Sequence, residues 1–281
     1  MKTPLISTII CTYNAEAYIN NTLISALEQT YENQEILILD NWSTDKTIEI
    51  LEKHAKNNAK VKIFNEWKNL WAYNWLNYLL DRAQWEYIAI QDHDDIWYSD
   101  KLRIQVEFLE THPEYIWSGT GTLMYYGKSK LWFLYDTKDR NTTKVIHTSL
   151  VFRNQWFRYD TENDFLCDWY FMQNILTKGK DVLKVHPEAL TLHYYKETGT
   201  NYSEQWFKLS VKNIKRYFDV YGVKFYFCIL LIYIIFFSYI KNYRIKRKID
   251  FTLLCWIKWA KPKKYLEESS KYLKEMLGYY N

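Results

Sequence analysis

The residues best suited to chemistry lie in one short segment, Gln91-Asp92-His93-Asp94-Asp95-Ile96-Trp97, directly after an apolar stretch. It holds three carboxylates within four residues, and they repel one another unless a cation or hydrogen-bond donors offset their charge. A divalent ion that also binds phosphate oxygens would do so, using one or two of the carboxylates. The segment therefore indicates either a Mg²⁺ or Mn²⁺ site or a solvated acidic turn before the next helix.

The chain ahead of this segment alternates between two hydrophobic patterns. Apolar, β-branched runs predict strands at 5–12, 35–40, 61–64 and 87–91. Helix-like spacing lies between them, at 14–28, about 45–55 and 70–82. This alternation predicts an α/β fold with a mostly parallel sheet and helices on both faces. Ligands of such sheets bind beyond the carboxyl ends of the strands, where Asp40 and the acidic segment lie.

The character of the chain changes near residue 203. Before it, a loosely patterned stretch contains an expected strand at 145–152, a helix at 168–177 and a strand within 181–192. Residues 1–202 carry 21 Lys and Arg against 27 Asp and Glu, whereas residues 203–281 carry 16 against 6. We therefore expect an acidic α/β domain at 1–202 and a helical, basic C-terminal region at 203–281.

The C-terminal region contains sixteen uncharged residues, Phe225–Ile240, flanked on both sides by Lys and Arg. A spanning helix needs about 20 apolar residues, and symmetric positive flanks give no orientation. The pattern favours a segment that lies in or dips into the cytoplasmic leaflet, with a single span or a buried helix as alternatives. The four cysteines show no metal-binding spacing, so we expect them to be reduced and cytosolic. Residues 1–7 have no charged segment followed by an apolar one, so the sequence predicts no signal peptide there.

Several further segments resemble family 2 glycosyltransferases of the GT-A fold, in particular those that build bacterial cell-surface polysaccharides. They occur in the family's order and at its separations, closely over about 4–112 and more weakly to about 200. The matching segments are STIICTYN at 7–14, LEQTY at 27–31, ILDNWSTD at 38–45, EYIA at 86–89, DHDDIW at 92–97 and SDKL at 99–102.

The resemblance implies an inverting transfer of a hexosyl or deoxyhexosyl group from a nucleotide-diphosphate sugar to a hydroxyl of a lipid-linked or polysaccharide acceptor. Mn²⁺ or Mg²⁺ would offset the charge that develops on the leaving diphosphate. Asp94 would be the principal metal ligand, with Asp92 on the metal or the ribose and Asp95 supporting them. The implied location is the cytoplasmic face of the cell membrane.

The resemblance also assigns roles outside the acidic segment. Asp168 would be the catalytic base, although an acid at a helix N-terminus is also favoured by the helix dipole. His193 and Lys196 are weaker candidates for phosphate contact, and a lone histidine such as His147 is as often structural. The implied nucleotide-sugar-binding residues are Thr12, Tyr13, Asn14, Asp40, Asn41, Asp92 and His147.

The chain departs from the family at loop positions where glycine is usual. Asn41-Trp42 replaces the usual Asp-Gly, and Trp71 and Trp85 also stand at glycine positions, while the first glycine of the chain is Gly119. One explanation is an inactive relative that serves as a binding or scaffold subunit. Another is that UGA codons which the source organism reads as glycine were translated as tryptophan, with Trp75, Trp156, Trp169 and Trp206 as further suspects. Binding to nucleic acid is disfavoured, because the basic residues of the tail bracket apolar runs.

Overall fold

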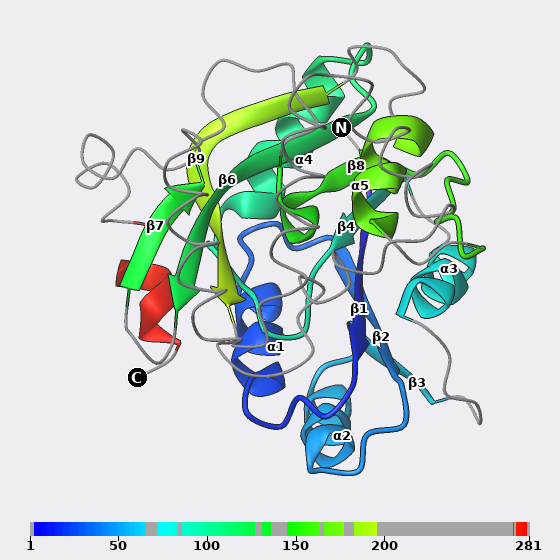
Figure 1. Ribbon diagram of the computed structural model, residues 1–281, viewed down its shortest axis with the longest axis vertical. Helices are drawn as coiled ribbons and strands as arrows, with labels where there is room; N and C mark the ends of the chain where they lie inside the picture. The colour runs from blue at the N-terminus through cyan, green and yellow to red at the C-terminus, as the bar shows by residue number, and fades with distance from the viewer. Residues whose placement is uncertain are drawn as a thin grey trace, which may run out of the picture.

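A single mixed sheet dominates the computed structural model (Figure 1). The structure describes residues 3–65, 72–83, 86–126, 131–135, 145–162, 166–176, 183–195, 272 and 274–279. Within these ranges nine strands pair in the order β3-β2-β1-β4-β8-β6-β9-β5, with β7 paired to β6. The α/β fold is confirmed, but the sheet is half antiparallel, because β5, β7 and β8 run against their neighbours.

The elements alternate along the N-terminal part and then give way to strands. The strands are β1 (Ile6–Thr12), β2 (Gln34–Asp40), β3 (Val61–Asn65), β4 (Tyr87–Ile90), β5 (Ile96–Trp97), β6 (Trp117–Tyr126), β7 (Leu131–Tyr135), β8 (Val151–Arg153) and β9 (Leu183–Tyr195). The helices are α1 (Ile19–Leu27), α2 (Thr47–Asn57), α3 (Ala72–Arg82), α4 (Lys101–Thr111) and α5 (Cys167–Tyr170), with a 3₁₀ turn η1 (His147–Ser149) and a π-helical segment η2 (Phe171–Leu176).

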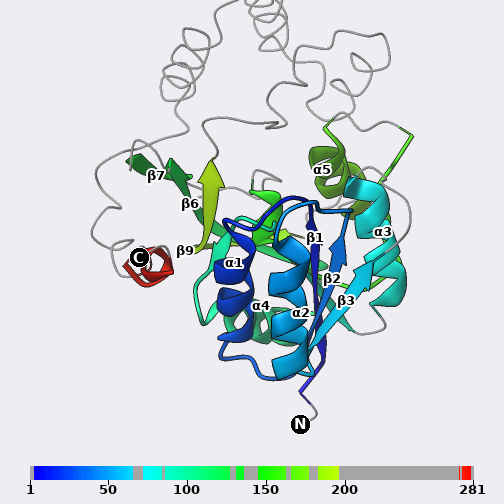
Figure 2. The ribbon, with the colours of Figure 1, turned by 90° about the horizontal axis from the view of Figure 1, so that it is seen from below.

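Helices cover both faces of the parallel half of the sheet (Figure 2). Successive side chains of a strand point to opposite faces, so Ile9 packs toward α3 and Ile10 packs toward α1 and α2. Helix α4 lies on the same face as α1 and α2, against Ile6 and Ala89. Because both faces are buried, these strands are continuous apolar runs, which made them recognisable in the sequence.

The register of the parallel strands brings their carboxyl ends together. Thr12 at the end of β1 lies beside Asp40 at the end of β2, and the Gln91 N–H after β4 donates to the Ile9 carbonyl of β1 at 3.1 Å. The loops that follow these three strands therefore begin at one edge of the sheet, as predicted.

The second half of the sheet is built on β6 and β9, which pair in parallel with an irregular register around Gly121. A Cβ on Gly121 would lie 2.9 Å from the Glu188 carbonyl oxygen, so the close backbone approach requires glycine here. The expected strand at 145–152 is correct only at its end, in β8. Residues 147–149 form a 3₁₀ turn instead, because Thr148 and Ser149 accept hydrogen bonds from the Asp92 N–H and from the Trp97 and Gln105 side chains rather than joining the strand ladder.

The end of the chain returns to the sheet. Residues 274–279 place Met276 in a buried cluster with Ile96 and Leu192, and the Glu275 carboxylate accepts the Ser99 N–H at 3.0 Å. Across the described part of the chain no helix combines the length and apolar character needed to cross a bilayer. The segment Phe225–Ile240 lies outside the described residues.

Candidate active site

The loops that follow β1 and β2 are bound to each other through Asn14. Its backbone N–H donates to the Ser43 hydroxyl at 2.9 Å, and its side-chain oxygen accepts the Thr44 N–H at 2.8 Å. Asn14 has a φ of 46°, a left-handed conformation that asparagine tolerates better than most residues. These bonds hold the loops after β1 and β2 together, and the Tyr13 side chain is exposed beside them.

Asp40 closes the loop after β2. Its carboxylate is buried and accepts both the N–H and the hydroxyl of Ser43, at 3.0 and 2.5 Å. The next residue, Asn41, donates its N–H to the Thr12 carbonyl and accepts the Trp75 indole N–H on Oδ1 at 2.6 Å. Asp40 thus shapes the loop, and the indole fixes the direction of the Asn41 amide.

The acidic segment is held by polar side chains from both halves of the sheet. The Gln91 amide donates to the Ser25 hydroxyl at 3.2 Å and to the Asp95 carbonyl at 3.3 Å. Thr148 of η1 accepts the Asp92 N–H on its hydroxyl and the Trp97 indole N–H on its carbonyl. The backbone that carries the carboxylates is therefore fixed before any ligand binds.

Asp95 has a structural role, because its carboxylate bonds residues of β9. Its carboxylate is fully buried, accepts the Tyr194 N–H at 3.0 Å, and lies 3.0 Å from His193 Nδ1. Burial lowers the pKa of the His193 imidazole, but Asp95 and the neighbouring carboxylates outweigh it and raise the pKa to about 9. This ion pair joins the acidic segment to β9. Lys196, the other predicted phosphate contact, lies outside the described residues.

Asp92 and Asp94 are the other two carboxylates of the acidic segment. Burial, Asp95 and Asp94 all raise the pKa of Asp92, which shows that the segment concentrates negative charge. Carboxylate and imidazole ligand atoms of Asp92, Asp95 and His193 lie within 4.8 Å of one another, and Asp94 is outside that group. His193, protonated and paired with Asp95, has no lone pair to offer a metal, so the carboxylate oxygens are the donors for a divalent ion. Carboxylate oxygens suit Mn²⁺ or Mg²⁺, so the residues fit the predicted ion.

His147 lies between Asp92 of the acidic segment and Tyr159. Its Nδ1 is 4.0 Å from the Asp92 carboxylate, and its Nε2 is 2.6 Å from the Tyr159 hydroxyl. Burial lowers the pKa of the imidazole to about 3, so the ring is neutral near pH 7. The structure thus places His147 beside Asp92.

Asp168 stands in the first turn of α5, which passes directly into the π-helical segment η2. Leu166 precedes the helix in a left-handed conformation, with a φ of 52°. Burial raises the pKa of the Asp168 carboxyl to about 6. Hydrogen bonds from the backbone N–H groups of Trp169 and of Asp168 itself lower the pKa, but burial outweighs them. Phe171, three residues after Asp168, stacks on Tyr159, which bonds His147 beside Asp92. The charge of Asp168 also contributes to the raised pKa of Asp92.

Some residues that build the site had no signal in the sequence. Tyr159 and Ser25 are common residue types in unremarkable contexts, and their roles come from contacts across 12 to 72 positions of the chain. Only the elements that bring them together reveal these contacts.

The chain was compared with known proteins. The model of the family "Glycosyl transferase family 2" matches residues 7–172. The putative teichuronic acid biosynthesis glycosyltransferase TuaG of Bacillus subtilis is 40% identical over 106 residues, which are 38% of this chain and 42% of that protein. The Escherichia coli protein UDP-Glc:alpha-D-GlcNAc-diphosphoundecaprenol beta-1,3-glucosyltransferase WfaP is 41% identical over 107 residues, 38% of this chain and 42% of that protein. The match thus spans less than half the length of these relatives.

Solved structures share the fold. S. aureus TarS 1-349, in complex with UDP-GlcNAc, aligns with a TM-score of 0.60 at 17% identity, over 76% of this chain and 72% of that one. The mannosyltransferase PcManGT from Pyrobaculum calidifontis, in complex with GDP-Man and Mn²⁺, aligns with a TM-score of 0.57 at 20% identity, over 73% of this chain and 61% of that one. These likenesses confirm the GT-A fold.

Proposed function

Because the chain belongs to glycosyl transferase family 2, we propose that it moves a hexosyl or deoxyhexosyl group from a nucleotide-diphosphate sugar to an acceptor hydroxyl, with inversion. One observation carries the proposal. His147 lies 4.0 Å from Asp92 and bonds the Tyr159 hydroxyl. The Tyr159 ring stacks on Phe171, three residues after Asp168, so contacts link Asp92 to α5 although 76 positions separate Asp92 from Asp168 in the chain. In the proposed reaction the acidic segment after β4 binds the donor, and the partly buried Asp168 is the base.

The loops after β1 and β2 form the nucleotide side of the proposed site. Asn14, Asp40 and Ser43 hold them in one conformation, so binding a nucleotide requires little ordering of the loops. Thr12, Tyr13, Asn14, Asp40 and Asn41 are the residues that we assign to nucleotide binding. The nucleotide sugars named for TarS and PcManGT support this class of donor.

Asp168 takes the acceptor proton in the proposed reaction. The acceptor oxygen attacks the anomeric carbon, its proton moves to the Asp168 carboxylate, and the bond from that carbon to the diphosphate oxygen breaks. A single displacement of this kind inverts the configuration. With its pKa near 6, the carboxylate is deprotonated at neutral pH yet more basic than an exposed aspartate, which suits a general base.

Asp92 and Asp94 would hold the divalent ion, which when bound offsets the negative charge on the leaving diphosphate. The Asp95–His193 pair fixes the backbone beside them without occupying either carboxylate. His147, neutral and buried, provides a hydrogen-bonding group next to Asp92.

Two relatives support a proposal for the acceptor class and the cellular location. WfaP acts, by its name, on a diphosphoundecaprenol-linked sugar, and TuaG is assigned to teichuronic acid synthesis. We therefore assign this chain to cell-surface glycan synthesis at the cytoplasmic face of the membrane, with a lipid-linked or polysaccharide acceptor. The basic region 203–281 would provide membrane contact.

A second candidate is an inactive relative that binds a nucleotide sugar or a partner. The observation that favours it is the Asn41 side chain, which replaces a carboxylate and whose oxygen already accepts the Trp75 indole N–H.

Release of nucleoside diphosphate separates the two candidates. Purified full-length protein is incubated with UDP-, GDP- and dTDP-sugars, Mn²⁺ or Mg²⁺, and undecaprenyl-diphosphate-linked acceptors. An active enzyme should release the nucleoside diphosphate from one of the donors, and a metal chelator should abolish that release. Donor binding without any release would instead support the inactive relative.

A further inference from the structure

The hydroxyl of Tyr159 bonds the buried ring of His147. The Tyr159 oxygen lies 2.6 Å from His147 Nε2, and both side chains are more than nine-tenths buried. Their rings meet nearly edge to face, with centroids 5.6 Å apart. Tyr159 lies on the segment that follows β8, whereas His147 lies on η1, so the bond joins two parts of the second half of the sheet.

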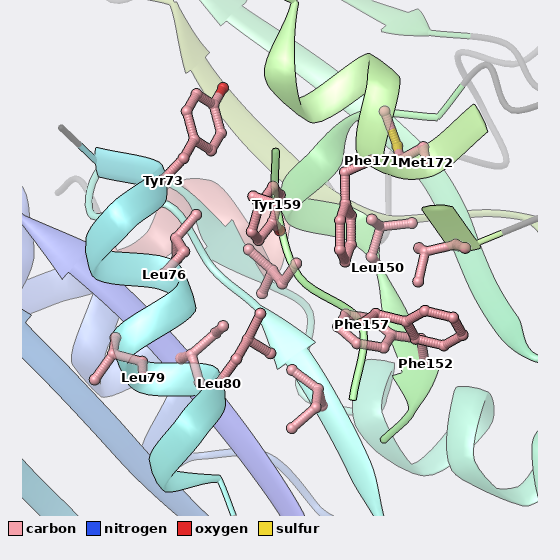
Figure 3. Close-up of a cluster of buried hydrophobic side chains, with 14 of the residues drawn as sticks. Tyr73, Leu76, Leu79, Leu80, Leu150, Phe152, Phe157, Tyr159, Phe171 and Met172 are labelled. Carbon is pink, nitrogen blue, oxygen red and sulfur yellow. The ribbon is translucent and has the colours of Figure 1, made fainter. Parts of the chain in front are cut away.

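The Tyr159 ring is fixed from several directions (Figure 3). Its backbone N–H donates to Asn77 Oδ1 at 2.8 Å, and its carbonyl accepts the Asn77 amide at 2.9 Å. The ring stacks on Phe171 of η2 with centroids 3.9 Å apart, and its other neighbour is Tyr73 of α3. Contacts with α3 and with the segment that follows Asp168 thus set the position of the hydroxyl.

The direction of the hydrogen bond follows from the position of Asp92 on the far side of the His147 ring. A neutral imidazole carries its proton on one nitrogen and accepts on the other. The ring nitrogen that faces a carboxylate is the favoured site for the proton, and Nδ1 is the nitrogen 4.0 Å from Asp92 Oδ1. Nε2 then has to accept, and the Tyr159 hydroxyl is the donor beside it.

We propose that Tyr159 is a positioning residue whose hydroxyl donates to His147 Nε2 and thereby keeps Nδ1 of the ring directed at Asp92. The effect on catalysis rests on the proposed function, in which Asp92 contacts the donor or the metal. The effect on the His147 tautomer does not depend on it, because it follows from the contacts of three side chains.

The tautomer is measured directly by long-range ¹H–¹⁵N NMR of the full chain labelled with ¹⁵N-histidine. His147 is assigned by the signal that disappears in His147→Gln. We expect wild-type His147 to be protonated at Nδ1 and Tyr159→Phe to shift the proton toward Nε2, since a free imidazole favours that nitrogen. A wild-type ring protonated at Nε2, or an unchanged ring in Tyr159→Phe, would overturn the proposal. The wild-type spectrum alone decides the matter if the variant does not fold.

Kinetics test the consequence for the site. Tyr159→Phe should lower kcat about tenfold, the equivalent of one well-placed hydrogen bond, and raise the Mn²⁺ concentration for half-maximal rate. Tyr87→Phe is the matched control, because Tyr87 is equally buried and its hydroxyl bonds Glu110 and Arg153. Equal losses of kcat in Tyr159→Phe and Tyr87→Phe would show that Tyr159 contributes only to stability and would contradict its positioning role. Absence of turnover in the wild type would refute the proposed function and leave the NMR result standing.

A second, independent inference comes from the backbone at two tryptophans. Among the described residues four non-glycine positions have positive φ, and two of them are Trp42 at 65° and Trp156 at 60°. Their side chains are 53% and 73% exposed, so little burial favours an indole there. The Cβ atom of tryptophan makes a left-handed backbone sterically unfavourable, and the indole cannot offset that cost by hydrogen-bonding its own backbone. Glycine, which has no Cβ, adopts this conformation at no steric cost.

We infer that the native protein carries glycine at positions 42 and 156, as expected if UGA codons of its gene are read as glycine. The loop after β2 then reads Asp-Asn-Gly-Ser, with glycine where the turn closed by Asp40 and Ser43 needs it. Trp97 behaves differently, because its ring is fully buried and its indole N–H donates to the Thr148 carbonyl. Trp71, Trp85 and Trp206 lie outside the described residues, and the buried, hydrogen-bonded Trp75 gives no support to the inference.

Peptide mass spectrometry of the protein isolated from its source tests the assignment. We expect glycine at 42 and 156 and tryptophan at 97, and tryptophan at 42 and 156 would overturn the inference. In recombinant protein of the printed sequence, Trp42→Gly and Trp156→Gly should each raise Tm by a few degrees, whereas Trp97→Gly should lower it. A lower Tm in Trp42→Gly would contradict the backbone argument.

Discussion

The two halves of the sheet supply their carboxylates in different ways. In the parallel half, β1, β2 and β4 end at one edge, and the acids there follow directly from strand order and register. In the mixed half, Asp168 comes from a short helix that begins after a left-handed residue and continues as a π helix. The proposed donor side therefore follows from the fold, while the proposed base depends on a local irregularity of the backbone.

This difference also appears in the electrostatics. The pKa of Asp92 is raised by burial and by its own neighbours Asp95 and Asp94, so a cation relieves the crowding. The pKa of Asp168 is raised by burial, a state that suits a group exchanging a proton with a neutral hydroxyl. Changes in one half should therefore alter donor and metal binding, and changes in the other should alter the chemical step.

Asp168→Asn should produce the largest loss. Removing a general base slows the step by about 10² to 10⁴-fold, while donor binding should persist. In the wild type kcat/KM should fall as pH drops below about 6, because protonation of Asp168 removes the base. The measurement is transfer rate against pH, and a wild-type midpoint near pH 4 would argue against Asp168.

Asp94→Ala should lower the transfer rate about a hundredfold or more, since the charge on the leaving diphosphate would lack its counterion. Glu107→Gln is the control, because Glu107 is an exposed carboxylate that pairs with Arg103 on α4. Steady-state rates across a Mn²⁺ titration provide the comparison. Wild-type rates in Asp94→Ala would place the metal ligands elsewhere.

Asp40→Asn should weaken the donor side without altering the chemical step. The Ser43 N–H and hydroxyl would lose a charged acceptor, so donor affinity should fall about tenfold, or ~1.4 kcal/mol. Ser43→Ala removes one of the two bonds and should have a smaller effect. Calorimetric titration with the donor measures both, and an equal fall in kcat would show that the two halves are not separable in this way.

The Asp95–His193 pair should have the smallest effect, on stability. The folded-state pKa of His193, about 9, lies above its usual 6.5, so the pair stabilises fully below pH 6.5 and is lost as pH rises through 9. Metal-free protein should lose on the order of 1 kcal/mol of unfolding free energy between pH 7 and 10, after allowance for partial exposure. Urea titrations should show no such loss in His193→Gln.

The sequence predicted the first half of the molecule well, because parallel strands buried on both faces are continuous apolar runs. Strand β4 and the acidic segment after it lie where expected, and the fold class follows from their alternation with helices. The contact of Asp95 with His193 was not predictable, since β9 reaches the acidic segment through pairing across 98 positions.

The second half was harder to predict for a physical reason. Residues 145–152 have strand-like composition, yet His147–Ser149 form a turn because Trp97, Gln105 and Asp92 bond to it. Strand β6 was not predicted as one long element, since its glycines lower strand propensity and its pairing with β9 is interrupted. Such features depend on partners that lie far away in the chain.

Thermal unfolding with nucleotide sugars tests most directly whether the two halves have separate roles. Wild type, Asp94→Ala and Asp168→Asn are each heated with Mn²⁺ and a series of UDP-, GDP- and dTDP-sugars, since ligand binding raises Tm. We predict that one donor stabilises the wild type and Asp168→Asn alike and leaves Asp94→Ala unchanged. Equal stabilisation of all three proteins, or of none, would contradict the assignment of the donor side to the parallel half.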